Sequence, residues 1–522
     1  MHNLNESDVC YLDVFKDNGY ITSECFVPYY LYSKKHFDKI DYQYFTTDFL
    51  IISVWGNRLK HFSELKKKRE LTDDEYRDIF IQLDLAFEAW DNFLNTDNQD
   101  KYKYIERLVK DFNFEEARAS LQKEKAKYLS SKKEYADSFL EKGENHELFT
   151  NIKTCDYGNY LDDPFLDENY FRKYSSFIKR IAKLQLRLNI KNNKIEYKKL
   201  ISSIFQNIGN HAIEGYLKSL LFMLFSGKLA TRYKHDNFIK MLPSCRVLLR
   251  GAVNQILNNE SGAPIEIHLH PEELHNRTSF FTYDLSDKAL LDHEMTLFND
   301  YLGQINHRFK GEVIYDLSLL YIDDCIREAF NSLKKAGALD NTVLVITSDH
   351  GYSYDCTPLR EQFVNNHHTE NYHIPLIIYD GSNPQGKKVD SYHTSKDVIP
   401  TICDLCGLNK PQSMNGKSLL DSTNAPDYAI SEYMGGGCPD MRERPIQFMI
   451  RNAQYLVCYN VKMNEPFENG ELVEVYDLEK DPDELNDIKQ SVDKDDLNYL
   501  LGFLKNRQKE IYESFQKSTA EL

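Results

Sequence analysis

The stretch VLVITSDHGYSYD, Val343 to Asp355, places two metal-binding side chains directly after an apolar segment. Asp349 offers an anionic oxygen and His350 an imidazole nitrogen, a pair that suits Zn, Mn, Mg or Ca depending on the remaining ligands. Adjacent side chains on a strand point to opposite faces, but a turn at Gly351 can bring both to one centre. We therefore predict a divalent metal site, with a structural Asp that caps the next turn as the alternative.

Two other stretches carry groups for acid–base or nucleophilic chemistry. HLHPEELH contains His270 and His275, and histidine can donate or accept a proton near neutral pH. MLPSCRVLLRG contains Ser244 and Cys245, followed by Arg246. Either the hydroxyl or the thiol can be activated by a metal and a helix N-terminus. The alternative interpretations are a surface turn rich in Glu and His, and a helix-start Ser beside a buried Cys.

Length, charge and cysteine usage narrow the class of protein. A chain of 522 residues with 41% hydrophobic residues can form one large domain with attachments or two or three smaller ones. Its net charge of -17 argues against a nucleic-acid or anionic-membrane surface. No signal-peptide pattern opens the sequence, and the longest apolar run, LLFMLF, is too short to span a bilayer. We expect a cytoplasmic protein with reduced cysteines, including Cys403 and Cys406 as core thiols.

The elements that must position these groups differ between the two halves of the chain. In the first half, Thr72 to Glu75 predicts a capping box that opens a helix. Apolar residues recur there at steps of three and four, which predicts a buried face made of Phe80, Leu83, Phe87, Trp90 and Leu94. Further helices are expected over 101–142, 167–188 and 194–225.

From about residue 262, strands and helices alternate. Strands are predicted at 265–270, 343–347 and 373–379, with a helix over 316–337. This alternation predicts an α/β fold with a mostly parallel sheet sandwiched by helices, in which ligands gather at the carboxyl ends of strands. Asp349 and His350 stand at such an end.

Several ordered motifs resemble the sulfatase family of the alkaline phosphatase superfamily. LKKAGALDNT followed by VLVITSDHG resembles its strand and metal motif, and HIPLIIYDG and HTSKDVIPTICDLCGL resemble the strand and helix that follow. ISEYMGGGCPDM, FMIRNAQYLVCY and EVYDLEKDPDELND resemble its C-terminal subdomain. The resemblance covers about 262–487. The helical pattern of the first half predicts a divergent, largely helical region over 1–240, in which 48–57 is a candidate first strand. The resemblance implies an α/β core over 241–425 and a small α+β subdomain with a terminal helix over 426–522.

The resemblance also implies roles for the candidate residues. Asp349 and His350 would bind the metal, and His275 would assist the leaving group. Ser244 or Cys245 would attack the ester or position the nucleophile. The remaining candidates would contact the substrate, namely Arg246, His270, His368 and His373.

Two parts of the family pattern are missing from the sequence. No acidic metal-ligand pair follows the first candidate strand, DFLIISVWGNR, which ends in Trp55, Gly56 and Asn57. The nucleophile motif is opened to P-S-C-R, so its recognition spacing is broken and formylglycine is not expected. A catalytic role for Ser244 or Cys245 requires a rearranged loop.

These observations predict a metal-dependent hydrolase or transferase of a sulfate or phosphate-type ester, of a carbohydrate or another small polar substrate. A catalytically degenerate binding or scaffold protein, with the helical N-terminal half as its partner surface, is the alternative from another class. A phosphodiesterase or phosphoethanolamine-type transferase is the third.

Overall fold

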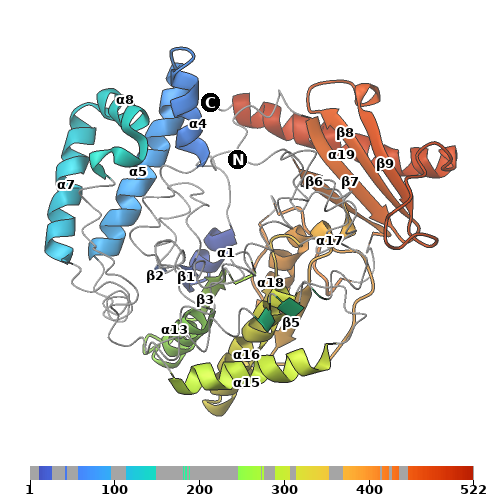
Figure 1. Ribbon diagram of the computed structural model, residues 1–522, viewed down its shortest axis with the longest axis horizontal. Helices are drawn as coiled ribbons and strands as arrows, with labels where there is room; N and C mark the ends of the chain where they lie inside the picture. Colours follow the sequence, from blue (N-terminus) through green and yellow to red (C-terminus); the bar gives the residue numbers. More distant parts are fainter. Residues whose placement is uncertain are drawn as a thin grey trace. The chain divides into compact units, whose positions relative to one another are not determined.

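The computed structural model describes residues 11–25, 42–43, 57–95, 113–148, 180–181, 183–184, 187, 245–271, 273–274, 288–305, 313–351, 368–411, 414–421, 426–433 and 445–520. They belong to two compact units, and Figure 1 labels their helices and strands. Phe15–Ala338 form what we call the N-terminal unit, and Leu339–Leu522 with Met1–Val14 form the C-terminal unit. Mixed helices and strands confirm the α/β class.

A group of packed helices makes up one part of the N-terminal unit: α4 (Asn57–Lys66), α5 (Asp73–Asn95), α7 (Phe114–Ser130) and α8 (Lys132–Lys142). The predicted capping box opens α5, because the Thr72 N–H donates to Glu75 Oε2 (2.8 Å) and the Glu75 N–H to Thr72 Oγ1 (3.3 Å). The predicted apolar face is confirmed: Phe80 is half-buried, and Leu83, Phe87, Trp90 and Leu94 are buried.

A parallel sheet forms the other part of the N-terminal unit, in the order β2 (Tyr42–Gln43), β1 (Ile21–Cys25), β3 (Ile265–Leu269). Helix α13 (Cys245–Leu257) is joined to it by Gln255 Nε2, which donates to Ser23 Oγ (2.6 Å). Helices α15 (Lys288–Gln304) and α16 (Val313–Lys335) complete this part, with Phe298, Leu317 and Tyr321 in their core.

The C-terminal unit begins with β4 (Val343–Thr347), which pairs with β5 (Leu376–Asp380). These two strands run antiparallel, unlike the parallel pairing that the alternation of elements suggests. The register places Thr347 opposite Leu376, so the carboxyl end of β4 lies beside the segment that enters β5. Helix α18 (Val398–Cys406) contacts β4, and its Cys403 is buried, as expected of a core thiol.

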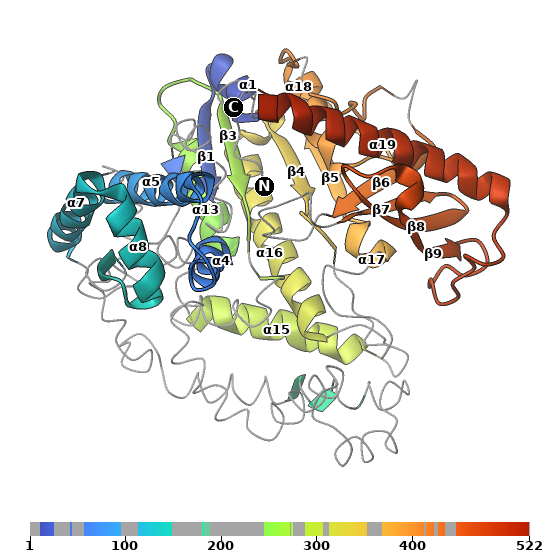
Figure 2. The same cartoon turned by 90° about the horizontal axis from the view of Figure 1, so that it is seen from above.

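A second sheet fills the rest of the C-terminal unit. Its four antiparallel strands are β6 (Tyr428–Tyr433), β7 (Pro445–Asn452), β8 (Tyr455–Lys462) and β9 (Glu471–Asp477). Helix α19 (Lys494–Ala520) lies along one face (Figure 2), where Leu500 and Leu504 pack on Phe448 and Val457. The small C-terminal α+β subdomain is thus present as the motifs predicted.

Several predictions fall wholly or partly outside the described residues. Those of 48–56 and 194–225 are outside, as is most of 167–188. Asn57 begins α4, so the strand predicted over 48–57 does not extend to this residue. Within the described ranges, none of the helices has the length and apolar character needed to cross a bilayer.

Mild acid should destabilise the helical part of the N-terminal unit. His146 is 2% exposed and lies against the Tyr135 and Phe139 rings. Burial lowers its pKa below the usual value, so the unfolded chain binds a proton first and stability falls as pH drops below about 6.5. Melting temperatures are compared at about pH 7.5 and about pH 5.5. Between these pH values, the melting temperature should fall less for His146→Gln than for the wild type. Equal losses in both proteins would contradict this assignment.

Candidate active site

Asp349 and His350 form a tight turn at the carboxyl end of β4. The His350 backbone N–H donates to Asp349 Oδ1 (2.9 Å), and His350 Nδ1 lies 2.7 Å from the carbonyl oxygen of Gly351. A carbonyl oxygen can only accept, so this contact places the ring proton on Nδ1 and leaves the lone pair of Nε2 available for a ligand. The side chains are 43% and 44% exposed, respectively.

The donor atoms of this turn fit a divalent cation. His350 Nε2 lies 3.7 Å from Asp349 Oδ2. Metal–ligand bonds of about 2.0 to 2.6 Å would let one cation contact both atoms. The Gly351 carbonyl that holds Nδ1 acts like the outer partners that orient metal-binding histidines. No group of three His, Cys, Asp or Glu side chains that could hold a metal occurs among the described residues.

Gly351 fixes the turn against α17 (Thr369–Tyr372). Its N–H donates to the Asn371 carbonyl oxygen (2.8 Å). A Cβ atom at Gly351 would lie 2.0 Å from the Glu370 carbonyl oxygen, well inside van der Waals contact. The backbone of α17 therefore passes too close to the Asp349–His350 turn for any residue but glycine.

His368 is buried just before α17 and is paired with an acidic side chain from far along the chain. Its Nδ1 lies 2.8 Å from Glu484 Oε2, and the Thr369 N–H donates to the same oxygen (3.1 Å). Burial raises the pKa of the Glu484 carboxyl, but the hydrogen bonds from His368 and Thr369 outweigh it and lower the pKa. Arg451 Nη1 donates to Thr369 Oγ1.

Glu484 and Arg451 are not among the residues predicted from the sequence. Glu484 lies in the stretch EVYDLEKDPDELND, which resembles a subdomain motif but carries no sign of a site. Its partner His368 is 116 positions earlier, and no local periodicity marks such a contact. The run of acidic residues in this stretch reads equally well as a solvated turn.

Cys245 and Arg246 begin α13, in the N-terminal unit. Cys245 is 1% exposed, and a hydrogen bond with Cys325 and burial raise the pKa of its thiol well above the usual range. The thiolate is the nucleophilic form of cysteine, so this environment disfavours attack by Cys245. The Cys245 backbone N–H donates to Oε1 of buried Glu273 (2.6 Å), another residue that sequence analysis missed.

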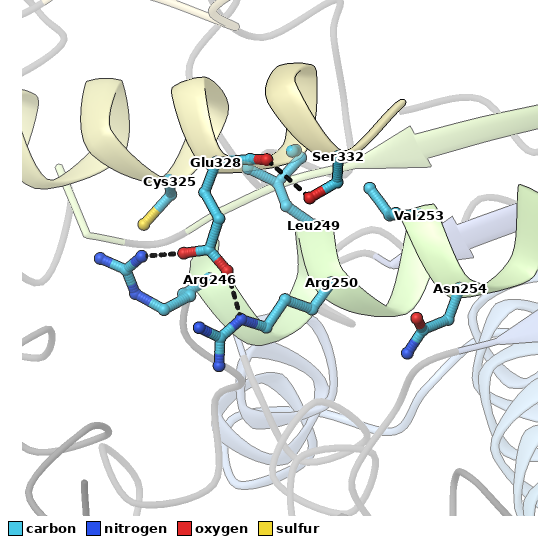
Figure 3. A pocket seen from close by; sticks show the side chains of 9 residues that line it. Arg246, Leu249, Arg250, Val253, Asn254, Cys325, Glu328 and Ser332 are labelled. Atoms are coloured by element: carbon cyan, nitrogen blue, oxygen red, sulfur yellow. Dashed lines mark hydrogen bonds and ion pairs between the residues drawn. The ribbon is translucent and has the colours of Figure 1, made fainter. Parts of the chain in front are cut away.

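The Arg246 guanidinium is 2% exposed and is surrounded by carboxylates. It contacts Asp324 (3.0 Å), Glu294 (3.4 Å) and Glu328. Figure 3 shows Arg246 and Arg250 reaching Glu328 from α13, beside a cavity of about 150 Å³. These contacts are those of a structural ion-pair network, and they do not support the predicted role of Arg246 in neutralising an ester.

The other predicted residues are placed as follows. His373 is exposed at the end of α17, and His270 is half-buried just after β3. Ser244 and His275 lie outside the described residues. The C-terminal unit thus holds Asp349, His350, His368 and His373, and the N-terminal unit holds Cys245, Arg246 and His270.

Two family models match the chain. The model described as Sulfatase matches residues 188–408, and the model described as N-sulphoglucosamine sulphohydrolase, C-terminal, matches residues 364–511. These matches confirm the predicted resemblance to the sulfatase family of the alkaline phosphatase superfamily. The sulfatase match begins well before residue 262, where the motifs become recognisable, and the second match extends beyond residue 487 into α19.

Individual sulfatase relatives are distant. Arylsulfatase K of Bos taurus is 24% identical over 215 residues, 38% of this chain and 37% of that protein. An N-acetylglucosamine-6-O-sulfatase of Bacteroides thetaiotaomicron is 25% identical over 183 residues, 33% of this chain and 31% of that protein. The chain therefore matches about a third of the length of these relatives.

Among solved structures, one from work on glycosaminoglycan metabolism by Bacteroides thetaiotaomicron has 20% sequence identity and a TM-score of 0.38. It covers 50% of this chain and 59% of its own. This likeness is too weak to transfer residue roles.

Replacing Gly351 should disturb the junction between the Asp349–His350 turn and α17. Gly351→Ala forces a shift of the 370–371 backbone and should lower stability by about 1–3 kcal/mol. Gly386→Ala is the matched control, because nothing lies within 4 Å of its added Cβ. Chemical denaturation should show a clear loss for Gly351→Ala and little change for Gly386→Ala. Equal effects would contradict the close approach.

Arg246 and Arg250 should differ sharply when each is replaced by Met. Arg246→Met removes the buried guanidinium that contacts Glu294 and Asp324 and should destabilise by about 3–5 kcal/mol. Arg250 is 53% exposed, so Arg250→Met should cost at most about 1 kcal/mol. Denaturant unfolding measures both values. A stable Arg246→Met protein that loses ester hydrolysis would instead restore the predicted role of Arg246.

Proposed function

We propose that the protein is a metal-dependent hydrolase of sulfate esters on carbohydrate-type substrates. The observation that carries this proposal is the turn after β4, where His350 Nε2 and Asp349 Oδ2 face each other at 3.7 Å. The match of residues 188–408 to the Sulfatase family model supports the reaction class. The N-acetylglucosamine-6-O-sulfatase relative supports an amino-sugar ester as the substrate.

In this proposal Asp349 and His350 hold the divalent cation. A cation bound there would supply electrophilic activation of the ester. The Gly351 carbonyl keeps the His350 proton on Nδ1, so that Nε2 can bind the cation without first losing a proton. Gly351 also fixes the turn through Asn371, which lowers the cost of ordering the ligands.

The remaining roles are assigned from the family resemblance and the local contacts. We infer that His275 donates a proton to the leaving oxygen and that His368 contacts the substrate. His270 and His373 are further candidates for substrate contact. The nucleophile stays open: Ser244 is the better candidate, because the protonated Cys245 thiol is a poor one. We expect no formylglycine in the P-S-C-R stretch, and we retain a cytoplasmic location as a prediction.

A catalytically degenerate protein is the second candidate. It is favoured by the lack of a third His, Cys, Asp or Glu side chain beside the turn within the described residues. Such a protein would keep the fold and bind a partner, for which the helical part of the N-terminal unit offers a surface.

Removing the Asp349 carboxylate should abolish metal binding and hydrolysis together. Asp349→Asn keeps the shape of the side chain but loses its charge. Loss of a residue that only orients a metal ligand typically lowers metal affinity or activity by about 10–100-fold. For the loss of a ligand itself, we expect kcat/KM to fall by at least about 100-fold. Asp390→Asn is the control, since Asp390 lies in the same unit and is 74% exposed.

The assay compares aryl sulfate, aryl phosphate and glucosamine 6-sulfate, with metal content measured by mass spectrometry. Sulfate preference with loss in Asp349→Asn supports the proposal. Preference for the phosphate ester would contradict the sulfate ester as substrate and indicate a phosphate ester hydrolase. A wild-type protein that is metal-free and inactive toward all three esters would favour the degenerate alternative.

A further inference from the structure

Glu484 combines burial with an unusual backbone conformation. Its φ of 53° makes it the one non-glycine residue with positive φ in the described part of the chain. Residues with a β-carbon seldom occupy this region, and a carboxylate is seldom buried without partners. Glu484 is 4% exposed. A side chain held in this way generally serves a specific contact.

Asp481 holds the turn around Glu484 through backbone hydrogen bonds. Asp481 Oδ2 accepts hydrogen bonds from the backbone N–H groups of Leu485 (2.8 Å) and Asn486 (2.7 Å). The Glu484 N–H donates to the Asp481 carbonyl oxygen (3.1 Å). This arrangement fixes the backbone while leaving the Glu484 carboxylate for contacts elsewhere.

The Glu484 carboxylate binds the segment that leads into α17. Glu484 Oε2 lies 2.8 Å from His368 Nδ1 and accepts a hydrogen bond from the Thr369 N–H (3.1 Å). Arg451 Nη1 lies 4.0 Å from Glu484 Oε1. The Tyr476 ring packs beside the imidazole, with the ring centroids 5.6 Å apart. When the imidazole is neutral, a carboxylate at Nδ1 keeps the proton there and leaves Nε2 as an acceptor.

Arg451 Nη1 donates to Thr369 Oγ1 and stays 4.0 Å from the Glu484 carboxylate. The partner at 2.8 Å is a ring nitrogen, and a carboxylate there selects the position of the ring proton. Among the described residues, none forms a hydrogen bond with His368 Nε2.

The contacts also connect Glu484 to the metal turn. The His368 carbonyl oxygen accepts the Asn371 N–H (3.0 Å), and the Asn371 carbonyl oxygen accepts the Gly351 N–H (2.8 Å). Gly351 directly follows Asp349 and His350. A shift at Glu484 would therefore reach the metal turn through two backbone hydrogen bonds.

We propose that Glu484 is a positioning residue for the active site, which holds His368 with Nε2 available to accept a hydrogen bond from the substrate and holds α17 against the Gly351 turn. The role of Glu484 in catalysis rests on the proposed function. The tautomer of His368 and the anchoring of α17 are independent of the proposed function.

Glu484→Gln tests this proposal with little change in shape. The amide can accept one hydrogen bond, but it lacks the charge that selects the Nδ1–H tautomer. Glu479→Gln is the matched control, because it makes the same chemical change at an exposed position just after β9. The tautomer of His368 is read from ring nitrogen shifts in histidine-labelled protein, above the usual histidine pKa of about 6.5. The His368→Gln variant assigns the signal.

We expect His368 to carry its proton on Nδ1 in the wild type and in Glu479→Gln, and to show a mixture of tautomers in Glu484→Gln. The kcat/KM of Glu484→Gln should fall by about 10–100-fold. If Glu484 acts through His368, adding Glu484→Gln to His368→Gln should lower activity little further. An unchanged tautomer in Glu484→Gln, or fully additive losses, would overturn the proposal.

The two proposals fail in different ways. A wild-type protein that hydrolyses none of the esters would sink the proposed function, and the nitrogen shifts would still decide whether Glu484 sets the tautomer. An active wild type with equal activity and equal shifts in Glu484→Gln would sink the positioning role alone.

Discussion

The close approach of two backbone segments at Gly351 is the constraint on which the candidate site depends. The Glu370 carbonyl oxygen occupies the space in which a Cβ would stand, and the Asn371 carbonyl oxygen accepts the Gly351 N–H. This contact requires the antiparallel pairing of β4 with β5, which returns the chain to the end of β4. Without it, Asp349 and His350 would lie in an unsupported exposed turn, and ordering them around a cation would cost conformational entropy.

Two buried charge networks serve different ends in this chain. Arg246 is enclosed by acidic side chains of α15 and α16, so its charge is neutralised within the N-terminal unit. In the C-terminal unit, Glu484 contacts one nitrogen of His368 and leaves the other without a described partner. The Arg246 guanidinium thus makes its contacts with carboxylates of its own unit, whereas a neutral His368 that donates from Nδ1 keeps Nε2 as an acceptor. A buried polar pair therefore points to function only when its donors and acceptors are counted.

Local patterns predicted the parts of this structure that depend on neighbouring residues. The capping box at Thr72, the buried face of α5 and the strand from Val343 to Thr347 all follow from short-range periodicity and hydrogen bonding. Asp349 and His350 could be proposed from the sequence because both side chains come from one turn. The Arg246 network and the His368–Glu484 pair were not predictable, because they join residues that are 48 to 116 positions apart. A sequence shows such residues as ordinary surface charges.

Anomalous diffraction from crystals grown with Mn²⁺ tests the central claim most directly, because it locates the cation without assuming any activity. The account predicts a peak bonded to an Asp349 carboxylate oxygen and to His350 Nε2, with His350 Nδ1 still on the Gly351 carbonyl. A bound cation elsewhere, or no peak at the end of β4 at saturating Mn²⁺, would contradict it.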